Sequence, residues 1–511
     1  MSRSVPSQRL LHATGIVMAL FVASRIAGLA RDIAISYRFG TSAEYDAYVA
    51  AFNIPDFLFN VIAGGALTSA LLPTFTSLLA HDRQGDAWRL ASGIINLALV
   101  LVTAGAGIAF IFAAPLAEAT IARGFSPEQR SLTVNLMRVM LITPVVFGVS
   151  ATVQGILNSF RHFTTPALAP IVYNLAIIFG ALFLAPTFGV YGLAYGVVAG
   201  ALLHLVVQLP VLFRLGAEFF ATLGWRDENV RHVGALMLPR MLGLATVQIN
   251  FLVNTVLASS LGEGGVSSLR YGFALMLLPE AIVAQAIATT VFPALSEFVA
   301  HKDWEGLSRL FSNAFRATLF LALPASVGLI VLREPIIQLL YQRGEFDARS
   351  TDQVAWVLQF YALGLFAHAG LEIVARVFYA LHDTATPVKI GLGAMVINIV
   401  LSLALIGPLQ QGGLALANSL ATILELAVLM YTIRRRLGRI DGTRIAKSLA
   451  RTTLASLLMG VVVYLMLVNL HLASWLAALS GIVIGGAIYL AAAWLLKSEE
   501  IAFGWQLVTG K

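Results

Sequence analysis

The residues of this chain that could do chemistry are charged side chains inside long apolar runs. The densest group lies in residues 24–32, which include Arg25, Arg31 and Asp32. On a helix with about 100° per residue, Arg25 and Asp32 fall within about 60° of each other, and Arg31 lies roughly 120° from Arg25. A guanidinium group donates two parallel hydrogen bonds to a phosphate. We therefore expect Arg25 and Arg31 to face an anionic substrate.

The alternative for these arginines is structural, because an arginine–aspartate pair could fasten the first predicted helix to the second. Asp46 and Asp56 in the next apolar run are the candidate partners. Asp46 opens that run, where its charge also complements the helix dipole. Asp56 follows a proline that is expected to kink the helix. Both aspartates are therefore candidates for pairing, gating or direct binding.

The second half of the chain offers a similar acidic residue and a basic one. Glu280 follows Pro279, as Asp56 follows its own proline, which favours a paired role at two kinks. Arg270 lies early in the same run and could point into a central cavity or extend to the membrane interface. Glu372 and Arg376 stand four residues apart in the favourable order, which predicts a local ion pair.

Amides and histidines inside apolar runs form a third group. Asn250, Asn254 and Asn398 could coordinate a sodium ion together with backbone carbonyls, although bonding between helices is the commoner use of such amides. His204 and His368 are more typical of packed helix interfaces than of metal sites. A sodium ion is thus one candidate for a coupling ion, and the membrane potential is the other.

Motifs for covalent catalysis are absent from the sequence. The chain has no cysteine, so it can form neither disulfides nor thiolate centres. It also lacks the GxxxxGK[ST], HExxH and GxSxG patterns of phosphate loops, zinc peptidases and serine hydrolases. We therefore expect a transporter with no catalytic residues and no cofactor, driven by an ion gradient or by the membrane potential.

The elements that must position these residues follow from composition. Of 511 residues, 59% are hydrophobic and only 12% are charged, about half the charge of a soluble domain. Apolar runs of about twenty residues recur, the length that crosses a hydrocarbon core as a helix. This predicts an all-α polytopic membrane protein with about fourteen transmembrane helices. Their approximate limits are 13–37, 45–79, 88–115, 131–159, 165–186, 190–213, 233–261, 266–299, 308–332, 351–381, 386–407, 412–434, 450–470 and 474–496.

Basic residues in the loops predict the orientation of these helices. The N-terminus, the even-numbered loops and the C-terminus hold most of the Lys and Arg, including the cluster from 434 to 451. The opposite side holds Arg38, Arg123, Arg130, Arg333, Arg343 and Arg349. By the positive-inside rule both termini are cytoplasmic. The positive charge is therefore a topology signal and does not indicate nucleic-acid binding.

An internal repeat divides the chain. Residues 73–82 resemble 293–303, residues 161–166 resemble 382–387, and Gly192 corresponds to Gly413, at offsets of 220 or 221 residues. Because the offset spans an even number of helices, the two copies share one orientation. We predict two parallel six-helix lobes, 1–215 and 216–440, and an unrepeated C-terminal helix pair in 441–511. Two-lobed repeats are typical of transporters that work by alternating access.

Together these motifs resemble those of the MurJ (MviN) family, the lipid II flippases of the multidrug/oligosaccharidyl-lipid/polysaccharide exporter superfamily. The resemblance covers essentially the whole chain. It rests on Ser24-Arg25, Gly28, Arg31-Asp32, Asp46-Ala47, Phe52-Asn53-Ile54-Pro55, Gly65-Ala66, Pro73, Phe378-Tyr379, Asp383-Thr384 and Thr386-Pro387-Val388-Lys389-Ile390.

The resemblance implies a bacterial inner-membrane flippase that moves undecaprenyl-pyrophosphoryl-MurNAc-pentapeptide-GlcNAc to the outer leaflet for peptidoglycan synthesis. It implies a cationic cavity containing Arg25 and Arg31, and a groove for the polyprenyl tail along the last two helices. Where relatives carry further charges, this chain has Phe59, Asn60 and Gly64, and Ala274 stands one turn after Arg270. The cavity is thus expected to hold fewer fixed positive charges.

Two other functions remain as alternatives. One is a flippase for another polyprenyl-linked glycan, or a drug or ion antiporter of the same superfamily. The C-terminal helix pair distinguishes these, because twelve-span drug exporters lack it. The other is a membrane-embedded glycosyltransferase or ligase, which the short loops disfavour. The predicted partners are lipid II or a similar polyprenyl-pyrophosphate saccharide and membrane lipids.

Overall fold

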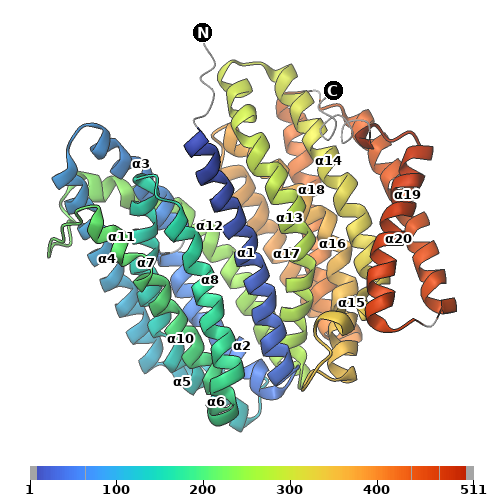
Figure 1. Cartoon of the computed structure of the whole chain (residues 1–511), viewed down its shortest axis with the longest axis horizontal. Coiled ribbons are helices and arrows are strands. Elements are labelled where there is room, and N and C mark those ends of the chain that lie inside the picture. Colours follow the sequence, from blue (N-terminus) through green and yellow to red (C-terminus); the bar gives the residue numbers. More distant parts are fainter. Residues whose placement is uncertain (1–7, 64, 439, 471, 502–511) are drawn as a thin grey trace. The chain divides into compact units, whose positions relative to one another are not determined.

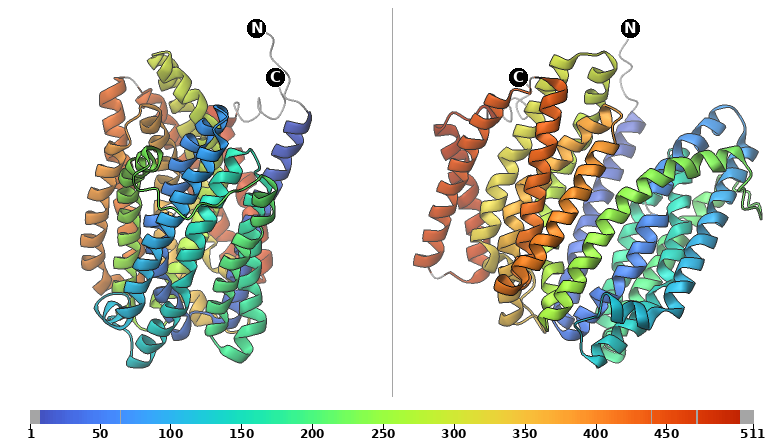
Figure 2. Two further views of the ribbon diagram at one scale, coloured as in Figure 1. Left: turned by 90° about the vertical axis from the view of Figure 1, so that its left-hand side faces the viewer. Right: turned by 180° about the vertical axis from the view of Figure 1, so that it is seen from behind.

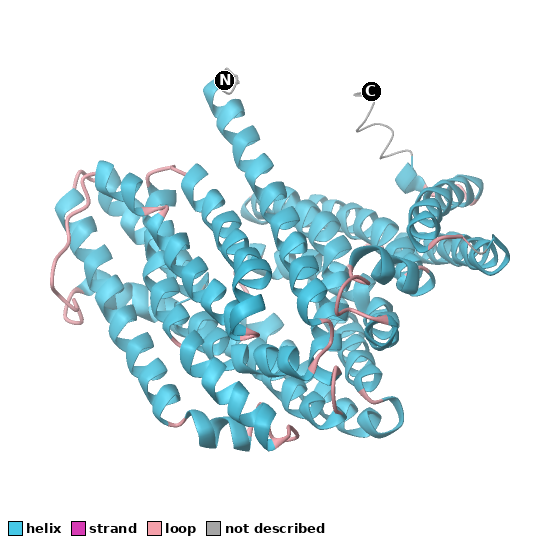
Figure 3. Cartoon of the chain, turned by 60° about the horizontal axis from the view of Figure 1, so that its bottom comes forward, coloured by secondary structure: helices cyan, strands magenta, loops and turns pink. Residues whose placement is uncertain are grey.

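Helices make up the regular structure of the described part of the chain (Figure 3). The structure is a computed structural model that describes residues 8–63, 65–438, 440–470 and 472–501. Gly64, one of the positions at which the sequence departs from its relatives, lies outside these residues. Within the described ranges no strand occurs, which confirms the predicted all-α class. The chain forms two compact units, Met1–Glu263 and Gly264–Lys511.

The first unit contains twelve α-helices and three short π- or 3₁₀-helical segments among its described residues (Figure 1). They are α1 (Gln8–Phe39), α2 (Ala43–Leu58), η1 (Phe59–Ala63), α3 (Gly65–Ala80), α4 (Gln84–Ile111), α5 (Ala113–Ala119), α6 (Pro127–Met140), α7 (Ile142–Ser159), α8 (Thr164–Phe179), η2 (Gly180–Leu184), α9 (Ala185–Phe188), α10 (Tyr191–Val206), α11 (Leu209–Arg214), α12 (Glu228–Ala258) and η3 (Ser259–Leu261).

The second unit is built from longer helices. They are α13 (Gly265–Ala300), α14 (Trp304–Val331), α15 (Arg333–Leu340), α16 (Ala348–Ala380), α17 (Ala385–Leu409), α18 (Gln411–Leu437), α19 (Gly442–Leu470) and α20 (Ser474–Leu495). The α19–α20 pair packs against α14 and α15. The predicted C-terminal helix pair is therefore present and belongs to this unit.

Twelve helical stretches of the described residues are long and apolar enough to cross a membrane. The sequence predicted about fourteen, and the two remaining predicted spans are α1 and the pair α2–α3. The first, α1, carries Arg25, Arg31 and Asp32 within its length. The second is divided at η1 into α2 and α3. This π-helical interruption begins four residues after Pro55, close to the predicted kink, as expected where a proline disturbs the helical hydrogen bonds.

The internal repeat is visible in the backbone. Asp82 and Lys302 both adopt a left-handed conformation with φ of 55°, and Arg161 and His382 do so with φ of 58° and 57°. The residues of each pair lie at the offset expected from the repeat. Each of the four turns also closes with a hydrogen bond between residues five apart, such as that from Arg83 N to Leu78 O. The two copies therefore fold alike at these turns, each within its own unit.

The repeated glycines have a steric reason. A side chain on Gly192 would place its Cβ within 3 Å of the Ala185 backbone, and one on Gly413 would meet the Leu405 carbonyl equally closely. No real Cβ contact is that short, so both positions require glycine. Close backbone approach through small residues is the common way in which helices pack in membranes. The same contact thus recurs in both copies.

The lobe limits drawn from the repeat remain a prediction. In the sequence, the residues of α12 form the first helix of the second copy of the repeat. In the structure α12 packs against α2, η1 and α3, and it lies in the first unit. One polar link in this packing is the hydrogen bond from Thr255 Oγ1 to Asn53 Oδ1, at 3.3 Å.

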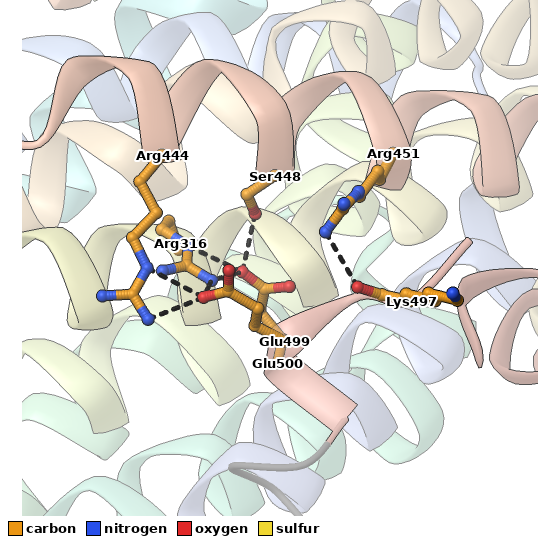
Figure 4. Close-up of polar contacts among 7 residues, drawn as sticks. All are labelled: Arg316, Arg444, Ser448, Arg451, Lys497, Glu499 and Glu500. Atoms are coloured by element: carbon orange, nitrogen blue, oxygen red, sulfur yellow. Dashed lines mark hydrogen bonds and ion pairs between the residues drawn. The ribbon is translucent and has the colours of Figure 1, made fainter. Parts of the chain in front are cut away.

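Past the end of α20, an ionic cluster fastens the chain to α14 and α19 (Figure 4). Arg316 of α14 donates from Nε to Glu500 Oε1 at 2.7 Å and from a terminal nitrogen to Glu499 Oε2 at 3.0 Å. Ser448 of α19 donates to the same oxygen of Glu500 at 2.7 Å. The side chains of Arg316 and Glu500 are only 5% and 7% exposed. We call Arg316, Arg444, Ser448, Glu499 and Glu500 the C-terminal ionic cluster.

The chain reverses at Lys497, which adopts a left-handed conformation with φ of 55°. The carbonyl of Lys497 accepts a hydrogen bond from Arg451 at 2.8 Å. Arg444 donates to Glu499 at 2.8 Å, and mainly this bond lowers the pKa of Glu499. A carboxylate with a lowered pKa stabilises the fold near neutral pH, and this contribution disappears as the pH falls through that pKa. The C-terminal ionic cluster therefore holds the α19–α20 pair at neutral pH.

We predict that reversing one charge of the buried pair destabilises the second unit. Glu500→Arg or Arg316→Glu leaves two like charges buried together, and breaking such a pair costs about 3–5 kcal/mol. The double variant, which exchanges the charges, should recover much of the loss. Thermal unfolding of the purified protein measures this. Arg309→Glu is the control, because Arg309 lies on the same helix in an exposed pair with Glu305. Equal melting temperatures for Glu500→Arg and the control would contradict the prediction.

Candidate functional site

The charged segment of α1 lies beside α8 in the first unit. Arg31 donates from Nε and a terminal nitrogen to Asp32 Oδ1, at 3.0 and 2.7 Å, and from its other terminal nitrogen to Asn174 Oδ1 at 3.1 Å. Asn174 is 7% exposed and donates to the Pro170 carbonyl of its own helix at 2.9 Å. Arg31 therefore ties α1 to α8 while its charge is partly balanced by Asp32.

Arg25 lies on a different side of α1. Its side chain is exposed in the structure, and its guanidinium lies over the Phe21 ring at 5.2 Å from the centroid. Cation–π stacking of this kind holds the group in position. The separation of Arg25 from Arg31 follows the angle expected from the sequence. Of the two arginines, Arg25 is the more accessible to a ligand.

Asp46 and Asp56 lie on α2, in the same unit as these arginines. Asp46 is completely buried in the first turn, where Ser42 caps the helix by accepting a hydrogen bond from Tyr45 N. Its carboxylate therefore lies at the positive end of the helix dipole. Asp56 is half-buried, and its backbone carbonyl accepts a bond from the Asn60 side chain at 2.9 Å. Asn60 therefore supports the backbone at the start of η1.

The predicted sodium ligands are divided between the units. Asn250 and Asn254 lie on α12 in the first unit, and Asn398 lies on α17 in the second. The buried side-chain oxygens of all three accept no hydrogen bond within the described ranges. Amide oxygens in this condition are suitable ligands for a hard cation. The sodium site itself stays a prediction.

Arg270 and Glu280 lie on α13 in the second unit. Arg270 is exposed near the start of the helix, and Glu280 is buried at 6% exposure. Ten residues separate them, a rise of about 15 Å along a helix. The two side chains are thus displaced along α13, and Glu280 is the one placed deep in the apolar run.

Two predictions for the other polar residues are confirmed. Arg376 pairs with Glu372 at 3.2 Å. His204 bonds to Ser150 Oγ at 2.7 Å, and His368 bonds to Asn418 Oδ1 at 3.2 Å. Both histidines therefore join packed helices. Within the part of the chain that the structure describes, no three His, Asp or Glu side chains gather into a possible metal site.

Neither Asn174 nor the C-terminal ionic cluster could be recognised from the sequence. The only signal for Asn174 was a lone amide in a strongly apolar run, and an amide alone does not reveal its partner 143 residues away. For the cluster, the signals were the place of Arg316 within an apolar helix and the presence of Glu499 and Glu500 after the last predicted span.

Comparison with known proteins identifies the family. The family model described as lipid II flippase MurJ matches residues 35–481. A lipid II flippase MurJ from Burkholderia cenocepacia is 31% identical over 436 residues, which cover 84% of each chain.

Solved structures agree with this assignment. A structure of lipid II flippase MurJ in an inward closed conformation has a TM-score of 0.82 and 26% identity, and it covers 95% of this chain and 100% of that chain. An inward-facing multidrug resistance MATE family transporter of the MOP superfamily has a TM-score of 0.70 at 17% identity, covering 84% of this chain and 99% of that one, and shows the fold alone. With the family model spanning most of its length, this multi-pass membrane protein belongs to the lipid II flippase MurJ family.

Proposed function

We propose that this protein is a lipid II flippase. It moves undecaprenyl-pyrophosphoryl-MurNAc-pentapeptide-GlcNAc from the inner to the outer leaflet for peptidoglycan synthesis, by alternating access of two lobes. The observation that carries the proposal is the family match over residues 35–481, with a relative of that name covering 84% of the chain. No bond is made or broken in this process, so the residues have binding and positioning roles only.

The arginines of α1 suit the proposed cargo. A pyrophosphate carries its negative charge on a compact group, and guanidinium groups bind it through paired hydrogen bonds. We assign direct contact to Arg25, which is exposed. We assign Arg31 a supporting role, because its nitrogens already bond to Asp32 and Asn174. Asp46, Asp56, Arg270 and Glu280 complete the proposed binding and gating set.

The α19–α20 pair supports a polyprenyl-linked cargo over a drug. The additional helix pair offers apolar surface for a long prenyl tail, since exposed large hydrophobic side chains line both helices. A small drug would not need this surface. The helix pair thus favours a lipid-linked saccharide as the cargo.

We further propose that the protein resides in the bacterial cytoplasmic membrane with both termini in the cytoplasm. The excess of Lys and Arg in the loops on that side supports this orientation. A sodium gradient or the membrane potential is proposed to drive transport. The buried, unbonded oxygens of Asn250 and Asn254 support sodium.

The first test is replacement of a host's own flippase. In a bacterium depleted of its lipid II flippase, we predict that expression of this chain restores peptidoglycan synthesis and growth. Incorporation of labelled precursor into the cell wall measures this. Vector alone is the negative control, and a tagged copy confirms membrane insertion. Correct insertion without restored synthesis would contradict the proposed cargo and leave the fold assignment intact.

Substitution of Arg25 tests the proposed contact with the pyrophosphate. Loss of charged hydrogen bonds worth about 1.5–3 kcal/mol predicts that Arg25→Ala lowers flipping about 10- to 150-fold. Arg25→Lys should retain part of the activity because it keeps the charge without the paired donors. The matched control is Arg83→Ala, which removes an exposed arginine paired with Asp86 in a turn. Full activity of Arg25→Ala at a normal membrane level would remove Arg25 from the site.

A third prediction concerns the coupling ion. Asn250→Leu together with Asn254→Leu replaces both unbonded amide oxygens with apolar groups of similar size. If these oxygens bind sodium, the double variant should lose the sodium dependence of flipping in vesicles with an imposed gradient. Asn469→Leu is the control, because that exposed amide bonds to the Leu465 carbonyl of its own helix. Unchanged sodium dependence in the double variant would exclude these two residues as ligands.

A further inference from the structure

The connection between α11 and α12 is a segment without helical structure that lies against α4 (Figure 2). We call residues 217–225 the α4-bound segment. Asn96 of α4 donates from Nδ2 to the carbonyls of Phe220 and Thr222, at 3.0 and 2.8 Å. Ser92 Oγ accepts from Phe220 N at 3.0 Å and donates to the Glu218 carbonyl at 3.4 Å. Two side chains of one helix thus hold the backbone of this segment.

The hydrogen bonds of Ser92 and Asn96 lie about one and two helical turns beyond the last charged residue of α4. The last charged residue of α4 is Arg89, and the helix is apolar beyond it. Ser92 and Asn96 follow Arg89 by three and seven residues, which corresponds to about 5 and 10 Å along the axis. Because α4 is long and apolar enough to cross a membrane, with a mean hydropathy of 2.4 over its most apolar 18 residues, we expect the α4-bound segment to lie beside the apolar part of a spanning helix.

Non-helical backbone at such a depth must have its polar groups satisfied by protein. Asn96 and Ser92 supply partners for Glu218, Phe220 and Thr222. The hydroxyl of Thr222 accepts a hydrogen bond from Gly224 N at 3.1 Å. Backbone groups of Glu218, Phe220, Thr222 and Gly224 are therefore hydrogen-bonded within the protein.

The α4-bound segment packs closely against α4. An added Cβ on Gly93 would lie 3.5 Å from the Gly224 Cα and 3.2 Å from a Val230 methyl group. Gly224 has a positive φ of 60°, a conformation that side chains rarely adopt. Gly93 and Gly224 thus allow the two backbones to come close together.

The opposite side of the segment is aromatic and exposed. Phe219 and Trp225 are each 68% exposed and Leu223 is 43% exposed. Arg226 stacks over the Trp225 ring, at 5.1 Å from the centroid. Aromatic rings beside arginine are typical of the boundary between headgroups and acyl chains, where a ring meets apolar chains and a cation meets phosphate.

We propose that the α4-bound segment is a membrane-interface anchor. Phe219, Leu223 and Trp225 insert at the headgroup–acyl boundary of the leaflet around the start of α4, and Arg226 contacts lipid phosphates. The occupant of this exposed surface is lipid. The anchor fixes the level at which α12 begins, and it does not depend on which cargo the protein carries.

The chain's lack of cysteine makes a direct test possible. Single variants Phe219→Cys, Leu223→Cys and Trp225→Cys of the full chain are spin-labelled and reconstituted in phosphatidylcholine–phosphatidylglycerol vesicles. Power saturation then compares collisions with oxygen, which partitions into lipid, and with a water-soluble nickel chelate. Arg83→Cys is the aqueous control, and Val100→Cys, exposed on α4, is the lipid control.

The proposal predicts that all three labels collide more with oxygen than the aqueous control does, at a depth shallower than Val100→Cys. Collision with the nickel chelate as frequent as at Arg83→Cys would overturn it. Shielding from both reagents would also overturn it, because protein and not lipid would then cover the surface.

A second variant tests the attachment to α4. Asn96→Leu removes the two hydrogen bonds that Asn96 donates to the segment and leaves those of Ser92, so the label at Phe219→Cys should move toward water. Asn135→Leu is the matched control, because Asn135 is an exposed amide on α6. An unchanged depth in Asn96→Leu would contradict the role of α4. The depth measurement on the single-cysteine variants stands even if Asn96→Leu does not fold.

Discussion

The low polarity of the membrane is the constraint on which this structure depends. A charged side chain at the centre of a spanning helix costs about 2.5–3.5 kcal/mol even on insertion scales. The chain meets this constraint by giving its deep charges partners. Arg31 is bonded to Asp32 and Asn174, and Arg376 is bonded to Glu372. Arg25 is exposed, and it is the cation that we propose contacts the anionic cargo.

The same constraint explains two features near the ends of helices. The C-terminal ionic cluster buries Arg316 only because Glu499 and Glu500 return to it past the end of α20. The α4-bound segment lies beside the apolar part of α4, and its backbone is hydrogen-bonded to Ser92 and Asn96. In both places a part of the chain outside the long helices is fixed by side chains of a spanning helix. The α19–α20 pair and the start of α12 are thereby attached at defined levels.

Much of the fold could be predicted from the sequence because its signals are local. Runs of about twenty apolar residues predicted the helices, and the repeated turns at Asp82 and Lys302 are confirmed by identical backbone conformations. Ion pairs four residues apart, such as Glu372–Arg376, could be predicted for the same reason.

Contacts between distant residues could not be predicted in this way. Arg31 bonds to Asn174, and Arg316 bonds to Glu500, across 143 and 184 residues. From the sequence, Arg31 and Asp32 on α1 had several possible partners. The packing of α1 on α8 is what brings Arg31 to Asn174. The π-helical interruption η1 was also hidden, since the sequence locates a proline but not how the helix accommodates it. The set of ligands for cargo and ion therefore remains a proposal built on Arg25 and its neighbours.

The central claim is that the protein moves a polyprenyl-pyrophosphate saccharide across a bilayer. The most direct measurement is the transbilayer movement of fluorescent lipid II in vesicles containing the purified protein, followed by chemical quenching from outside. The account predicts that quenching exceeds one half of the label when the protein is present and stays at the outer-leaflet fraction in protein-free vesicles. Equal quenching in the two preparations, with the protein correctly inserted and an ion gradient and potential applied, would contradict it.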